Sequence, residues 1–165
     1  NPIGDQVRVY AVVDPFPRAW IVHNVEVIPD MEEALSRLSA DEFDLRQAAV
    51  VAEPLDARLS GARGNSTARV TAFAADRISV EVDAVDEGLL VVSEIHYPGW
   101  RASVDEQLAR LIRANAIQRG VPIPQGRHTV HIWYTPFTAR LGLVISGLAV
   151  VLIIAVGGWY VIRKA

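Results

Sequence analysis

The residues with the clearest chemical potential lie in and after the stretch EIHYPGWRASVD, which covers positions 94–105. Aromatic rings can stack on the apolar face of a sugar, while carboxylate, guanidinium and amide groups can hydrogen-bond to its hydroxyls. One interpretation of these side chains is therefore a carbohydrate-binding site made of Glu94, Tyr97, Trp100, Arg101 and Asn115.

The same stretch also has a purely structural interpretation. Pro98 and Gly99 are typical of a turn, and Tyr97 and Trp100 could then pack over the edge of a β-sandwich. Apolar and polar residues alternate over 100–104, as in a strand with one face turned inward. We favour the packed corner and keep the carbohydrate site as the alternative.

Other patterns that could carry chemistry are absent from the sequence. The chain has no G-x-S-x-G nucleophile elbow, no phosphate-binding glycine loop and no cysteine. His128 and His131 are three residues apart on a predicted strand, so their side chains point to opposite faces and do not converge on a metal. We therefore predict no catalytic residue, no metal ligand and no cofactor.

The elements that would position these residues are mostly strands. Asp30 can cap a helix that runs to about position 40, with Glu33 three residues further on. The apolar stretch 20–27 predicts a strand. From position 68, apolar and polar residues alternate in short runs that recur about every ten residues, with turn signals between them, one of which is 122–126. This spacing predicts a mainly β fold, an antiparallel β-sandwich with one short helix.

The predicted domain boundaries follow from these patterns. Residues 1–139 are expected to form one β-sandwich domain. Within it, we expect a strand and helix part at 1–58, an exposed loop at 59–67 and an all-β part at 68–136.

The last segment, 140–165, has a different composition. Residues 141–162 contain no charged side chain, and Arg140 precedes them while Arg163 and Lys164 follow. This length and the absence of charge predict that 141–162 form a transmembrane helix, with the lipid bilayer as its partner. The positive-inside rule then places the chain end in the cytoplasm and residues 1–139 outside it.

Two further features bear on partners. Gly142, Ser146 and Ala149 share a helical face, which suggests contact with other membrane helices of the same full-length chain. The 19 acidic residues all precede position 140, so the predicted ectodomain is acidic. An acidic domain without a basic run is not expected to bind nucleic acid.

The run GLLVVSEIHYPGWRASVD, followed by IRANAIQRGVPIPQGRHTVHIWYTP and an apolar helix, resembles the C-terminal end of the YfhO family of bacterial multi-span membrane proteins. PRAWIV at 17–22 and the segment 32–43 resemble the same region. The chain has Asp105-Glu106 where that family more often has an aspartate-glycine turn.

The resemblance implies a function for the whole protein. Such proteins are similar to glycosyltransferases that use polyprenyl-phosphate sugars to modify polymers of the cell envelope. Their catalytic acidic residue lies in an early outward loop that this chain does not contain. The chain would then be an accessory extracytoplasmic domain and last membrane helix, with a glycan or envelope polymer as a possible partner.

An alternative function is a single-span, membrane-anchored module that binds carbohydrate or a protein. An independent hydrolase is disfavoured because the motifs of such enzymes are missing. The chain begins at Asn1 without an apolar leader, which indicates a piece of a longer protein or a processed product.

Overall fold

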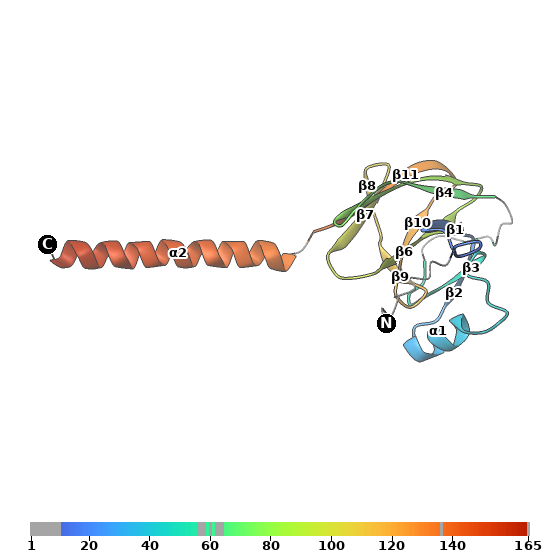
Figure 1. The fold of residues 1–165 in the computed structure, drawn as a ribbon, viewed down its shortest axis with the longest axis horizontal. Coiled ribbons are helices and arrows are strands. Elements are labelled where there is room, and N and C mark those ends of the chain that lie inside the picture. Colours follow the sequence, from blue (N-terminus) through green and yellow to red (C-terminus); the bar gives the residue numbers. More distant parts are fainter. Residues whose placement is uncertain (1–10, 56–58, 60, 62–64, 136, 165) are drawn as a thin grey trace, which may run out of the picture.

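The structure is a computed structural model that describes residues 11–55, 59, 61, 65–135 and 137–164. Two β-sheets are stacked face to face, with one short helix beside them and a long helix leading away (Figure 1). The six-stranded sheet has the order β1 (Ala19–Val22), β6 (Gly88–Ile95), β10 (Gln118–Ile123), β9 (Ile112–Ala114), β3 (Ala48–Val51) and β2 (Asn24–Val27). The five-stranded sheet has the order β4 (Thr67–Ala74), β5 (Arg77–Ala84), β11 (Gly126–Tyr134), β7 (Trp100–Val104) and β8 (Gln107–Ala109). The prediction of a mainly β protein with two sheets is confirmed.

The main core lies between the two sheets. On β5, Ile78, Val80 and Val82 are buried and alternate with more exposed polar residues, because successive side chains of a strand point to opposite faces. These residues pack with Leu90 and Val92 of β6 and with other apolar side chains of the facing strands. The alternation seen in the sequence thus decides which face of the five-stranded sheet is covered.

The six-stranded sheet is covered on its other face as well. Leu89 and Val91 of β6 belong to a second apolar cluster together with Trp20 and Val22 of β1. The chain after the short helix closes over this cluster, where the Trp20 indole Nε1 donates a hydrogen bond to the Leu45 carbonyl at 2.8 Å. A strand buried on both faces has no polar alternation, and 89–92 is accordingly an unbroken apolar run.

The short helix is α1 (Met31–Leu38), which confirms the helix predicted near 30–40. The Asp30 carboxylate accepts a hydrogen bond from the Glu33 backbone N–H at 2.9 Å, as an N-cap does. The helix connects β2 to β3, and these two strands pair in parallel. A parallel pair needs such a crossover, so the expectation of a wholly antiparallel sandwich is wrong at this one pair.

Residues 19–27 link the two edges of the six-stranded sheet. Their first half, β1, pairs with β6, and their second half, β2, pairs with β3 at the opposite end of the strand order. The break falls at His23, which is buried and bonded at both ring nitrogens, to the Glu87 carbonyl and the Ser66 hydroxyl at 2.8 Å each. The two edge strands are therefore consecutive pieces of one chain segment.

The prediction of a transmembrane helix at 141–162, within the segment 140–165, is wrong. Helix α2 (Phe137–Lys164) follows β11 and extends away from the sheets (Figure 1). A bilayer span needs about 20 consecutive, predominantly apolar residues in one helix. Among the residues that the structure describes, no helix combines the length and the hydropathy that crossing a membrane requires.

Residues 60 and 62–64 of the loop predicted at 59–67 lie outside the described residues, and Thr67 at its end begins β4. Strand β10 occupies part of a second predicted turn, since Pro122 and Ile123 pair with Leu89 and Gly88 of β6. Proline is tolerated here because β9 pairs only with Gln118–Gly120, which leaves Pro122 with a strand on one side alone.

Candidate functional site

The aromatic turn of the sequence forms a pinned corner. The Trp100 backbone N–H reaches the Tyr97 carbonyl at 3.4 Å, and the Thr135 N–H donates to the Gly99 carbonyl at 2.7 Å. Gly99 has a φ of 102°, and a Cβ at this position would lie 2.8 Å from the Tyr134 ring. Only glycine fits both the backbone angle and the close approach to the end of β11.

Two neighbouring side chains contact the ring of Trp100. The Arg119 guanidinium carbon lies 3.5 Å from the ring centroid, and the Tyr134 ring is 5.4 Å away, centroid to centroid. The indole is partly buried and packs against the core between the sheets. These contacts are those of a packed corner, whereas Tyr97 is 60% exposed.

The other predicted carbohydrate-binding residues lie in separate settings. Glu94 accepts a hydrogen bond from Arg18 Nη1 at 2.8 Å. Arg101 is exposed and alternates with core residues of β7, so it projects from the opposite face to Trp100. Asn115 is buried in the β9–β10 turn, where its Oδ1 accepts from the Val50 N–H at 2.9 Å. The structure does not gather the five into one cluster, and their binding of carbohydrate stays a prediction.

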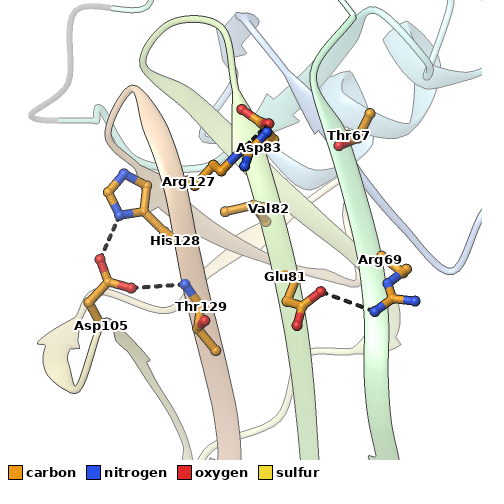
Figure 2. A pocket seen from close by; sticks show the side chains of 9 residues that line it. All are labelled: Thr67, Arg69, Glu81, Val82, Asp83, Asp105, Arg127, His128 and Thr129. Carbon is orange, nitrogen blue, oxygen red and sulfur yellow. Dashed lines mark hydrogen bonds and ion pairs between the residues drawn. The ribbon is translucent and has the colours of Figure 1, made fainter.

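A polar hollow on the outer part of the five-stranded sheet was not identified from the sequence. It has a volume of about 440 Å³ and crosses strands β4, β5 and β11 beside the β7–β8 turn (Figure 2). Its lining residues are Thr67, Arg69, Glu81, Val82, Asp83, Asp105, Arg127, His128 and Thr129.

Three acid–base pairs organise this hollow. Arg69 Nη2 lies 3.2 Å from Glu81 Oε2, and Arg127 Nε lies 2.8 Å from Asp83 Oδ2, each across neighbouring strands (Figure 2). These two pairs are largely exposed, so each contributes little to stability and can exchange partners with a ligand. The alternation of β5 could have placed Glu81 and Asp83 on the outer face. The register that brings arginines opposite them is not visible in the sequence.

The third pair, Asp105 and His128, also contacts the backbone. Asp105 accepts hydrogen bonds from the Thr129 N–H at 2.8 Å and from His128 Nδ1 at 2.6 Å. His128 Nε2 faces the Gln125 carbonyl at 3.1 Å, so both ring nitrogens face acceptors and the doubly protonated ring satisfies both.

These contacts move both pKa values in the direction that keeps the pair charged. The hydrogen bond to Asp105, opposed by partial burial, raises the pKa of His128 above its ordinary value. The hydrogen bonds from His128 and from the Thr129 N–H lower the pKa of Asp105. The contacts therefore favour a positively charged His128 beside a negatively charged Asp105 at the rim of the hollow.

No described residues gather as a set of three or more metal-binding side chains. The chemistry of the hollow is instead that of hydrogen bonding, with paired carboxylates and guanidinium groups beside two threonine hydroxyls.

Comparison with known proteins gives a family. The model of the family described as bacterial membrane protein YfhO matches residues 37–146, which include both sheets from β3 onward. The chain belongs to the YfhO family of bacterial membrane proteins. No curated protein and no solved structure matches the chain.

Membership of the YfhO family confirms the resemblance noted in the sequence and assigns the chain to a membrane protein. The matched region includes the aromatic corner and every lining residue of the polar hollow. The expected contacts of 141–162 with a bilayer and with other membrane helices stay predictions.

Proposed function

We propose that this chain is an accessory extracytoplasmic domain of a glycosyltransferase-like YfhO protein, one that would use polyprenyl-phosphate sugars to modify cell-surface polymers. In this proposal the domain binds the glycan part of the polymer through the polar hollow of Figure 2. Family membership supports the membrane setting, and the side chains of the hollow support the ligand class.

The observation that carries the proposal is the arrangement of charged pairs around an open volume. Sugars present neighbouring hydroxyls, and each hydroxyl can donate to a carboxylate while it accepts from a guanidinium. Glu81 with Arg69 and Asp83 with Arg127 supply two such combinations across three adjacent strands. Because both pairs are solvent-exposed, a sugar hydroxyl can insert between their partners at small energetic cost.

The Asp105–His128 pair at the rim of the hollow can orient the bound sugar. Asp105 and His128 are fixed by backbone contacts to Thr129 and Gln125, so their positions do not depend on a ligand. A site with a few fixed polar groups and several exchangeable ones can select a sugar by the direction of its hydroxyls.

The test is a titration of the chain with glucose and N-acetylglucosamine oligosaccharides, followed by NMR shifts of backbone amides. We expect shifts at 81–83 and 127–129, and Asp83→Ala should weaken the binding about tenfold by removing charge-assisted hydrogen bonds. Arg77→Ala is the matched control, since Arg77 is an exposed β5 arginine paired with its neighbour Asp76 and lies outside the hollow.

Two outcomes would contradict the proposal. One is the absence of shifts at saturating oligosaccharide. The other is a set of shifts confined to Tyr97 and Trp100, which would move the ligand to the aromatic corner instead.

A further inference from the structure

A buried arginine at one end of the sandwich lacks a full set of partners. Arg119 of β10 is 4% exposed, and its Nε donates to the Ile95 carbonyl at 3.0 Å. Its Nη1 is buried and, among the described residues, has no hydrogen-bond partner. The nearby Glu94 carboxylate is hydrogen-bonded to Arg18 instead. Glu94 attracts the Arg119 guanidinium only through space, so this buried positive charge has no directly bonded carboxylate.

A second arginine lies directly beside the first. Arg113 of β9 is the cross-strand partner of Arg119, so the two side chains leave the sheet on the same face. Arg113 is exposed, and its guanidinium makes no ion pair or side-chain hydrogen bond within the described part of the chain. Two adjacent arginines therefore concentrate positive charge at this end of the sandwich.

A hollow opens next to Arg113. It has a volume of about 250 Å³, and its polar lining consists of Glu53, His96, Arg110 and Arg113. Glu53 is ion-paired with Arg110, and the arginines whose charges act on His96 are Arg113 and the buried Arg119. Burial, and then the charges of Arg113 and Arg119, lower the pKa of His96, so this ring is neutral at pH 7.

We propose that this hollow is a binding site for a phosphate-class oxyanion. Arg113 forms the direct ion pair with the anion. One ring nitrogen of His96 donates to the Leu111 backbone, and the other donates to the anion when the ring is protonated. Arg119 acts as a positioning residue that holds Trp100 and supplies positive potential from behind. The site is distinct from the polar hollow of Figure 2, and its lining shares no residue with that hollow.

Bound anion would change the electrostatics of His96. A negative charge beside the ring favours the imidazolium form and offsets the two arginines. The pKa of His96 should therefore rise on binding, and by linkage the anion should bind more tightly as the pH falls. The other charged groups that line the hollow, Glu53 and Arg110, form an ion pair with each other.

The test uses inorganic phosphate, dimethyl phosphate and acetate as probes, with the 165-residue chain followed by NMR. In the wild type, saturating dimethyl phosphate should raise the pKa of His96 by about one unit, read from its ring protons. Dimethyl phosphate does not titrate near neutrality, so the pH dependence of its binding reports the protein alone. Arg113→Ala should weaken this binding about tenfold, whereas the distant surface variant Arg77→Ala should not change it.

Each outcome decides the proposal. Binding of dimethyl phosphate indicates a phosphodiester, from a lipid headgroup or a polymer, whereas binding of inorganic phosphate alone indicates a free or terminal phosphate. Acetate binding as tight as either phosphate would overturn the assignment to the phosphate class. An unchanged His96 pKa with all three probes would overturn the site itself, and this result would leave oligosaccharide binding at the other hollow unaffected.

Discussion

At the scale of single residues, the His128–Asp105 pair makes stability depend on pH in a predictable direction. The pKa of His128 is raised in the folded state, so the pair's contribution is complete below the ordinary histidine value of about 6.5. That contribution is lost as the pH rises through the folded-state pKa. At the acid end, the lowered pKa of Asp105 gives stability above its ordinary value that is lost as the pH falls through the folded value.

The first prediction follows from this sign. His128→Gln should lower the free energy of unfolding, measured in urea, by more at pH 6 than at pH 8.5. His131→Gln is the control, because His131 is an exposed histidine of the same strand whose ring hydrogen-bonds to the uncharged Ser79 hydroxyl. An equal loss at both pH values would show that His128 is not charged in the folded protein.

The second residue-scale prediction concerns the turn between β7 and β8. Asp105 and Glu106 have φ angles of 48° and 67°, the left-handed pair that a type I′ turn requires. Glycine adopts this region at no steric cost, so Glu106→Gly should raise the free energy of unfolding by about 0.5–1 kcal/mol. Glu106→Ala removes the same carboxylate without this freedom. If alanine stabilised as much as glycine, backbone strain would not be the reason.

At the scale of elements, the corner between β6 and β7 attaches the end of β11 to the sandwich. Trp100 is partly buried between Arg119 and Tyr134, so Trp100→Ala removes a ring contact from both and opens the end of the core. We expect a loss of about 2–4 kcal/mol in urea unfolding, less than for a fully buried tryptophan.

The neighbouring residue supplies the control for this element. Arg101 is exposed on the other face of β7, so Arg101→Ala should change stability by less than about 0.5 kcal/mol. A Trp100→Ala variant as stable as wild type would mean that the ring does not support the corner. The carbohydrate platform would then be the better interpretation of this stretch.

The sequence predicted correctly those elements that are determined by residues close to one another along the chain. The Asp30 cap and the alternation of β5 are both short-range, and both were correct. Pro122 was misleading because proline is typical of turns. Here it lies in β10 at a position that pairs with β6 on one side and has no paired strand on the other. The single strand predicted at 20–27 is divided at His23 between two sheet edges, which depends on contacts with Glu87 and Ser66 far along the chain.

At the scale of the whole molecule, the candidate sites depend on register that the sequence does not display. The polar hollow needs Arg69, Glu81, Asp83 and Arg127 to meet across three strands, and the cationic end needs Arg113 opposite Arg119. Composition predicted an acidic domain, but it did not show where a local excess of positive charge would lie. The apolar run 141–162 predicted a span that no helix of the described residues provides.

The proposed function requires that this YfhO domain face the outside of the cell, because glycan binding in the envelope depends on that orientation. The absence of cysteine allows a direct measurement with single cysteines and a membrane-impermeant thiol reagent in bacterial cells. Leu108 of β8 is 75% exposed, so Leu108→Cys offers an accessible thiol, and Val80→Cys in the core of the same sheet is the buried control. The account predicts that intact cells label Leu108→Cys as fully as permeabilised cells do, with Val80→Cys unlabelled in both. Labelling of Leu108→Cys only after permeabilisation would contradict it.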